Sequence, residues 1–123
     1  MKFPNDIKYT KDHEWVKISD GVAYIGITEF AQSELGDIVF VDVDTLNEEL
    51  DQEEVFGTIE AVKTVADLFM PVNSEIIEIN EILENEPEKI NSDPYNDGWI
   101  VKVKLSDNNN DDLLSYEEYN KFI

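Results

Sequence analysis

The sequence predicts a mainly β fold with a few short helices, and three observations support this class. Short runs with alternating apolar residues recur along the chain, turn-forming residues separate them, and capping residues precede two short segments. Alternation with a period of two is typical of strands that bury one face, and several such strands predict a sandwich or barrel. A length of 123 residues suits one domain, so we expect residues 1–123 to form a single domain.

Two strands joined by a tight turn open the chain. Residues 12–18 alternate as a first strand, and Asp20-Gly21 turns the chain into a second strand over residues 22–28. Asp-Gly favours tight hairpins because both residues tolerate a positive φ. His13 is the only histidine and lies in the first predicted strand. Because a zinc-binding helix needs a second histidine, we expect His13 to be a structural polar residue.

A helix and a further strand follow. Thr28 can cap a helix over residues 29–35, and Gly36 is placed to end it in a left-handed conformation. The near-continuous apolar run over residues 37–43 predicts a strand that is buried on both faces. Residues 45–54 are acidic and rich in turn formers, so we expect a connection there. The helix residues expected to face inward are Phe30, Ala31 and Leu35.

A hairpin in the middle of the chain displays one lysine. Two β-prone runs, residues 55–62 and 64–70, flank Lys63, which therefore lies at the predicted tip. Pro71 cannot donate to a β-ladder, so it marks the exit from the second strand. Four apolar residues at alternating spacing are expected to share the buried face: Ile59, Ala61, Val65 and Phe69.

Two more strands and a capped helix complete the prediction. Residues 75–79 and 99–105 alternate as strands, and residues 80–92 are irregular with one helical turn. Ser115 and Glu118 form a capping box that opens a C-terminal helix. The prediction totals about seven strands and two or three short helices. Two aromatic residues of the last helix are expected to face the same way: Tyr119 and Phe122.

The composition excludes several classes of function. With 29 acidic and 9 basic residues the formal net charge is -20, so nucleic acid would be repelled and self-repulsion favours a monomer. The absence of cysteine excludes disulfides and thiolate metal sites. No apolar run approaches membrane-spanning length, and residues 1–6 resemble neither a signal nor a transit peptide. We therefore expect a cytoplasmic protein, with a processed organellar form as the alternative.

Lys63 has two interpretations from its neighbours alone. It is either an ordinary turn lysine that favours solubility or an attachment point for a prosthetic group, since a rigid hairpin presents its amine at a defined place. A catalytic lysine is disfavoured, because Glu60 and Asp67 nearby would stabilise the ammonium form. No pair of nucleophile and base is readable elsewhere in the chain, so we expect no enzymatic activity.

The acidic segment Asp107–Glu118 supports a different class of function. Asp107, Asn109, Asp111 and Glu118 fall at the ligand positions of an EF-hand calcium loop. However, Asp112 stands where the loop needs glycine, and a strand precedes the segment instead of a helix. We therefore favour a solvated turn without a metal site and keep a calcium-binding or interaction module as the alternative.

A series of short motifs runs in order over nearly the whole chain. They are Lys8-Tyr9, His13–Val16, Gly26–Glu29, Ala31-Gln32, Leu35–Val41, Glu60–Val65, Pro71–Ile76, Asn91–Tyr95 and Gly98-Trp99. Together these motifs resemble the glycine cleavage system H protein family. The resemblance implies a barrel-sandwich hybrid of the lipoyl-domain type with short flanking helices, including a C-terminal one.

The resemblance also implies a cofactor and partners. Lys63 would carry lipoate in amide linkage, and Glu60, Val62 and Thr64 would be read by the lipoate-attaching enzyme. The protein would be a carrier and not an enzyme. It would take the aminomethyl group of glycine from a pyridoxal-phosphate decarboxylase to a tetrahydrofolate-dependent aminomethyltransferase, and then present the dithiol to dihydrolipoyl dehydrogenase. One flexible arm on a rigid base would serve all three active sites.

The family further implies a cleft that shelters the loaded arm. The resemblance places Glu14 beside this cleft, where its carboxylate would pair with the protonated amine, and Asp12 and Asp67 are further candidates. Exclusion of water there would protect the labile amine. The alternative is that Glu14 merely solvates the edge of a strand.

Several positions depart from the family pattern. Ala61 replaces a common serine, which would slow recognition by the attaching enzyme if the residue were accessible, and Asn47 and Glu53 occupy turn positions typical of glycine. A biotin carrier is disfavoured because Val62 and Thr64, and not methionines, flank the lysine. A protein that relays lipoate to other lipoyl domains remains an alternative.

Overall fold

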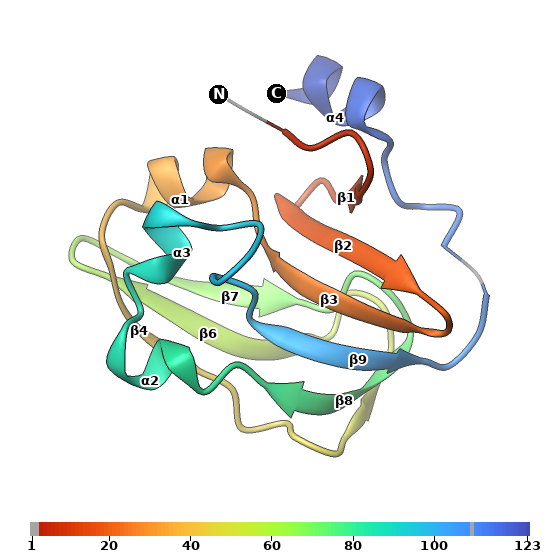
Figure 1. Ribbon diagram of the computed structural model, residues 1–123, viewed down its shortest axis with the longest axis horizontal. Helices are drawn as coiled ribbons and strands as arrows, with labels where there is room; N and C mark the ends of the chain where they lie inside the picture. The colour runs from red at the N-terminus through yellow and green to blue at the C-terminus, as the bar shows by residue number, and fades with distance from the viewer. Residues whose placement is uncertain (1–2, 109) are drawn as a thin grey trace.

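Two β-sheets face each other, with short helices along their edges (Figure 1). The computed structural model describes residues 3–108 and 110–123. All neighbouring strands pair antiparallel. The six-stranded sheet has the order β1 (Lys8–Tyr9), β2 (Glu14–Ser19), β3 (Val22–Ile27), β9 (Val101–Leu105), β8 (Ser74–Ile79) and β5 (Glu49–Leu50). The three-stranded sheet has the order β4 (Ile38–Asp42), β6 (Val55–Ala61) and β7 (Val65–Phe69).

Four helices accompany the strands in the described part of the chain. They are α1 (Glu29–Leu35), α2 (Ile82–Asn85), α3 (Lys89–Ser92) and α4 (Tyr116–Phe122). The predicted mainly β fold with short helices, including a C-terminal one, is therefore confirmed. No helix in these ranges is both long and apolar enough to cross a membrane.

The core divides into two apolar clusters. The larger one fills the space between the sheets with inward-facing side chains such as Ile25, Ile59 and Val103. Each fully buried side chain of this size contributes about 1.5–3 kcal/mol relative to exposure. A smaller, mostly aromatic cluster holds α4 against the first two strands, where Tyr9 and Tyr119 stack with ring centroids 4.7 Å apart. This second cluster brings the C-terminal helix next to the N-terminal segment (Figure 1).

The predicted turn at Asp20-Gly21 and the predicted caps of α1 and α4 are confirmed, whereas the left-handed conformation predicted for Gly36 was wrong. Asp20 and Gly21 both have positive φ, as the tight turn requires. The Thr28 hydroxyl accepts a hydrogen bond from Ala31 N, and the capping box of α4 is complete. Gly36 has a φ of 85° but a ψ of -157°, so it ends α1 with positive φ outside the left-handed helical region.

The strand predicted over residues 37–43 is not buried on both faces. Val39 and Phe40 of β4 are 47% and 52% exposed. β4 is an edge strand that pairs only with β6, and the register between the two shifts between Ile38 and Phe40. Because a bulge adds one unpaired residue, two successive side chains leave the core. An apolar run is thus compatible with a half-exposed edge.

The predicted buried face of the second hairpin strand was also wrong. Val65 is 63% exposed, whereas Leu68 is 2% exposed. In the hairpin register Val65 lies opposite Glu60, and Ala66 lies opposite the buried Ile59. Side chains opposite each other share a face, so Ala66 and Leu68 face the core while Val65 faces outward.

Short elements account for the remaining differences. The strand β5 lies in the predicted connection, and the helix α3 lies in a segment predicted as irregular. The prediction of about seven strands compares with nine strands among the described residues. Such elements carry little periodic signal because tertiary pairing defines them.

The helix side chains Phe30, Ala31 and Leu35 are half-buried against the two clusters, and Phe122 is 48% exposed.

Candidate functional site

Lys63 lies at the exposed tip of the β6–β7 hairpin, at the left of Figure 1. The turn is closed by a backbone hydrogen bond from Ala61 N to Thr64 O, at 2.8 Å. Apart from the buried Ala61, the residues of the tip are exposed: Glu60, Val62, Lys63 and Thr64. The most exposed large apolar side chain among them is that of Val62, at 75%. The hairpin predicted from the sequence is confirmed, and its tip is accessible to a protein that would read these side chains.

A cleft of about 460 Å³ opens beside this hairpin, between α1, β7 and the start of β2. All three predicted docking residues, Asp12, Glu14 and Asp67, line it, together with Glu34, which the sequence analysis did not identify. Glu34 lies three and four residues after Ala31 and Phe30, which puts it on the same face of α1. This spacing was the sequence pattern that could have indicated a role for Glu34 in the cleft. The apolar wall consists of Ile27, Phe30, Ala31, Leu35, Ile59, Ala66 and Leu68.

Glu14 is the buried carboxyl of the cleft, with only 2% of its surface exposed. Its Oε2 accepts a hydrogen bond from Phe69 N at 2.8 Å, and its Oε1 accepts one from the Thr10 hydroxyl at 3.2 Å. Glu14 therefore bonds β2 of one sheet to β7 of the other. The alternative in which Glu14 solvates a strand edge was wrong, because the side chain is removed from water.

The electrostatics of Glu14 follow from this burial. Desolvation raises the pKa of the Glu14 carboxyl to about 8, the Phe69 N–H opposes the shift, and the nearby Asp12 charge adds to it. Burial disfavours the charged form, while an opposite charge close by favours it. A cation that enters the cleft would therefore shift Glu14 toward its carboxylate form.

His13 forms part of the cleft wall but does not lie in a strand. It precedes β2 with a φ of 66°, a conformation that belongs to a turn and corrects the prediction. Its Nδ1 lies 2.8 Å from the Tyr119 hydroxyl, which in turn lies 2.8 Å from the Thr28 hydroxyl. Burial lowers the pKa of His13. These contacts with the buried Tyr119 of α4 support a structural role for His13.

Two predicted calcium ligands in the acidic segment before α4, Asp107 and Glu118, are engaged in other hydrogen bonds. Glu118 would be a ligand in a calcium loop, but its Oε1 accepts a hydrogen bond from Ser115 N at 2.9 Å in the capping box. Asp107 Oδ2 accepts one from the Asn73 amide at 3.1 Å. Among residues 3–108 and 110–123, no group of three or more His, Cys, Asp or Glu side chains could hold a metal ion. Asn109 lies outside the described residues.

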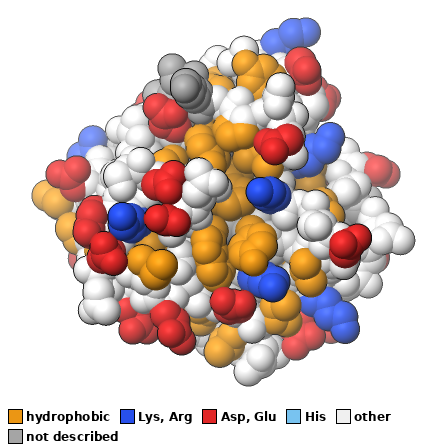
Figure 2. Space-filling view, viewed as in Figure 1, with side chains coloured by type: hydrophobic (Ala, Val, Ile, Leu, Met, Phe, Trp, Pro, Cys, Tyr) orange, Lys and Arg blue, Asp and Glu red, His pale blue; other side chains and the backbone are white. Residues whose placement is uncertain are grey.

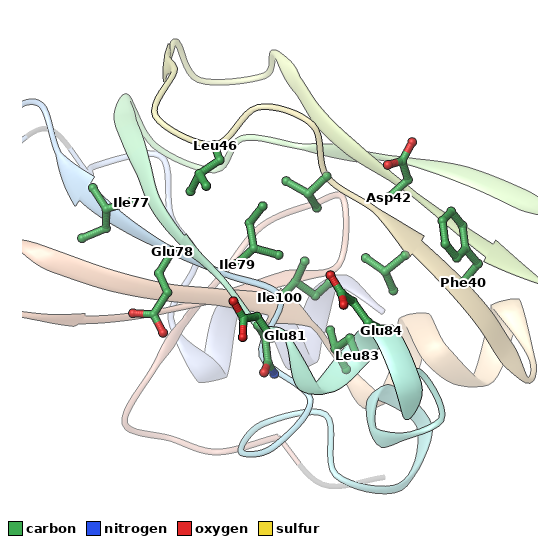
Figure 3. Close-up of a pocket in the computed structure, with 13 residues that line it drawn as sticks. Phe40, Asp42, Leu46, Ile77, Glu78, Ile79, Glu81, Leu83, Glu84 and Ile100 are labelled. Carbon is green, nitrogen blue, oxygen red and sulfur yellow. The ribbon is translucent and has the colours of Figure 1, made fainter.

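A second hollow of about 730 Å³ lies between β4 and β8 and was not identified from the sequence (Figure 3). Its floor is apolar, and Asp42, Glu78, Glu81 and Glu84 line it (Figure 3). The three glutamates recur at every third position, and this spacing was the only sequence pattern that could have indicated the hollow.

On the face seen in Figure 2, acidic side chains are spread among lysines around a hydrophobic band. The negative charge of the chain is thus not confined to one patch.

The two turn positions typical of glycine have the conformations expected from the family pattern. Asn47 and Glu53 have φ values of 69° and 76°. Positive φ is uncommon outside glycine, and asparagine tolerates it better than glutamate. The chain therefore keeps the backbone of the glycine turns while lacking the glycines.

Comparisons with known proteins agree with this geometry. A family model described as glycine cleavage H-protein matches residues 7–123. Glycine cleavage system H proteins of Bacteroides thetaiotaomicron and Bacteroides fragilis are each 52% identical over 120 residues, which is 97% of this chain and 95% of each relative. A crystal structure of a glycine cleavage system H protein from Mycobacterium marinum is similar with a TM-score of 0.90 and 37% identity, covering 97% of both chains.

Proposed function

Because this chain belongs to the glycine cleavage H-protein family, we propose that Lys63 is the residue that carries its lipoyl group. The family establishes that the chain is a lipoyl carrier of the glycine cleavage system. The observation that supports the assignment of Lys63 is its exposed position at the tip of a rigid hairpin, inside the motif Glu60–Val65.

The residues around Lys63 fit a lipoyl arm. Lipoate supplies a disulfide that accepts the aminomethyl group left from glycine. The aliphatic chain of Lys63 lies over Gly36, since a Cβ atom at Gly36 would come within 3.2 Å of Lys63 Cε. Leu35 and Glu34, the residues just before Gly36, line the cleft. An arm that starts at Lys63 therefore has a continuous path along the end of α1 into an apolar cleft.

Within the cleft we assign the main role to Glu14. Its carboxylate would pair with the protonated amine of the loaded arm, and the apolar wall would exclude water from that amine. Asp12 and Asp67 would add negative charge at the exposed part of the cleft. An exposed ion pair contributes little, so we expect both to matter less than Glu14.

The partners follow from the role of the carrier. We propose that the chain has no enzymatic activity and visits a pyridoxal-phosphate glycine decarboxylase, a tetrahydrofolate-dependent aminomethyltransferase and dihydrolipoyl dehydrogenase. A lipoate-attaching enzyme would read the exposed side chains of Glu60, Val62 and Thr64. The single domain over residues 1–123, the monomeric state and the cytoplasmic location remain predictions.

Mass spectrometry and one exchange assay test this function. The protein is incubated with a lipoate-attaching enzyme, lipoate and ATP, digested, and searched for a lipoyl increment. We expect it on the peptide that contains Lys63 and expect the modified protein to support exchange between glycine carboxyl and carbon dioxide by a purified decarboxylase. Modification at another residue would contradict the assignment. A lipoylated protein that does not support exchange would favour the relay alternative.

The role of Glu14 is tested by the lifetime of the loaded carrier. We expect Glu14→Gln, which keeps an acceptor for Phe69 N, to shorten this lifetime about tenfold, equal to about 1.4 kcal/mol for a lost charged hydrogen bond. Glu34→Gln is the matched control, because Glu34 lines the same cleft but is exposed. Equal lifetimes of Glu14→Gln and wild type would contradict the proposed role.

A further inference from the structure

The tip of the β6–β7 hairpin is bonded to the segment between α1 and β4. Val62 N donates a hydrogen bond to Asp37 O at 3.0 Å. The next residue, Lys63, lies over Gly36, where there is no room for a Cβ atom without moving the lysine chain. The position of the Lys63 backbone therefore depends on where residues 36–38 lie.

Residues 36–38 are held by backbone contacts, from Gly36 N to Gln32 O and between Ile38 and Ala61, and by one side chain, the amide of Asn91. Asn91 Oδ1 accepts a hydrogen bond from Ile38 N at 2.9 Å. Asn91 Nδ2 donates to Gly36 O at 2.9 Å and to Gln32 Oε1 at 2.9 Å. The amide thus bonds the residues on both sides of Asp37, whose carbonyl holds Val62. Three of the four hydrogen bonds that an asparagine side chain can make are used here.

Asn91 is presented from a firmly anchored helix. The preceding residue, Ile90, is fully buried in the core between the sheets. Gly98 N donates to Asp93 O at 2.9 Å, and a Cβ atom at Gly98 would lie 2.7 Å from Lys89 O, so the chain closes tightly over α3. Helix α3 lies beside α1, whose C-terminal end carries Gln32 and Gly36 (Figure 1).

We propose that Asn91 is a positioning residue for Lys63. It fixes the α1–β4 segment and, through Asp37 and Gly36, the hairpin tip that the lipoate-attaching enzyme must read. The inference rests on the proposed modification of Lys63. A tip that is ordered before binding spares the attaching enzyme the entropy loss of ordering it, so the effect falls mainly on KM. The amide is specifically required, because aspartate keeps the acceptor for Ile38 N but loses both donors.

The test compares three variants under attachment conditions. We expect Asn91→Ala and Asn91→Asp each to lower kcat/KM for lipoylation about tenfold, mainly through KM, because both lose the two donors of the amide. Asn96→Ala is the matched control, because Asn96 is exposed in the same connection and its amide donates to Asp93 Oδ1 at 3.2 Å, away from residues 36–38. We expect that variant to match wild type.

A second readout separates positioning from general stability. Hydrogen exchange of the Val62 amide should accelerate about tenfold in Asn91→Ala, while amides in the middle of β6 keep their protection. If Asn91→Ala does not fold, Asn91→Asp carries the same comparison. Unchanged Val62 exchange together with unchanged KM would overturn the inference. If wild type is not modified at Lys63, the proposed function fails, whereas the exchange measurement still tests the link from Asn91 to the tip.

Discussion

At the tip of the β6–β7 hairpin Val62 is 75% exposed, whereas in the adjacent cleft Glu14 is 2% exposed. The tip is held by backbone and amide hydrogen bonds, such as Val62 N to Asp37 O, which leave its side chains in water. The cleft instead withdraws a carboxyl from water and raises its pKa to about 8. A carrier needs both properties, since attachment requires access and protection requires the exclusion of water.

One strand serves both regions. Side chains of β7 alternate, so Val65 faces the solvent beside the tip while Leu68 faces the cleft and the core. The strand is also bonded to Glu14 through Phe69 N. The two environments therefore lie along a single strand, with the tip just before Val65 and the cleft at residues 66–68, and each can be changed by a substitution that leaves the other in place.

The largest effect is expected from a substitution that removes the attachment point and leaves the cleft intact. We expect Lys63→Arg to abolish lipoylation completely, because a guanidinium remains protonated and is a poor nucleophile. The residue is exposed, so the free energy of unfolding should change by less than about 0.5 kcal/mol. Intact mass and urea denaturation measure the two quantities. A lipoyl increment that persists in Lys63→Arg would show that the tip is not the attachment site.

The next prediction contrasts the two faces of β7. Leu68→Ala should lower the free energy of unfolding by about 2–5 kcal/mol, because it leaves a cavity between the cleft and the core. Val65→Ala, on the exposed face, should change it by less than about 0.5 kcal/mol. Denaturation in urea measures both, with wild type as the reference. Similar losses for the two variants would mean that the faces are not distinct.

The dependence of stability on pH tests the buried carboxyl itself. The pKa of Glu14 is raised from 4.5 to about 8 in the folded chain. Between these values the folded state binds more protons than the unfolded state, so the contribution of Glu14 to stability falls as pH rises, by up to about 1.4 kcal/mol per pH unit. Below that window this contribution is fully present, and above it no further loss follows.

Urea denaturation at several pH values across this window measures the effect. Glu14→Gln lacks the titrating group, so the difference between wild type and variant should decline with rising pH. Other carboxylates contribute equally to both proteins and cancel in the difference. A difference that is constant with pH would mean that Glu14 titrates normally.

The smallest expected effect concerns Ala61, the buried residue two positions before Lys63. Ala61 is 5% exposed, so the side chain cannot be read directly by an attaching enzyme. We expect Ala61→Ser to leave the lipoylation rate unchanged and to cost about 1 kcal/mol of stability, because a hydroxyl becomes buried. Steady-state lipoylation kinetics and urea denaturation measure the two quantities. Faster lipoylation of Ala61→Ser would mean that the attaching enzyme also recognises the buried side chain at position 61, and not only the exposed residues of the tip.

The candidate site was predicted in two different ways. The hairpin that displays Lys63 followed from strand alternation and from Pro71, but its function as a lipoyl site came from the resemblance to a family. The docking residues Asp12, Glu14 and Asp67 also came from that resemblance, and the structure brings all three to one cleft. Glu34 and Asn91 were not predicted as site residues, because no local pattern connects them with the lysine.

What the sequence by itself determined are the features with short-range causes. The Asp20-Gly21 turn, the cap at Thr28 and the capping box at Ser115 each depend on residues within a few positions of one another. Strand alternation likewise indicated the mainly β class. These signals persist in the structure because backbone conformation and local hydrogen bonds specify them without the rest of the chain.

Only the tertiary structure decided which of these features face water and which meet each other. Glu14 bonds to a residue 55 positions away, and Asn91 bonds to one 53 positions away. The exposure of Phe40 depends on the bulge opposite β6 and on the edge position of β4. Burial, register and long-range hydrogen bonds arise from the packing of two sheets, so a local pattern of residues cannot specify them.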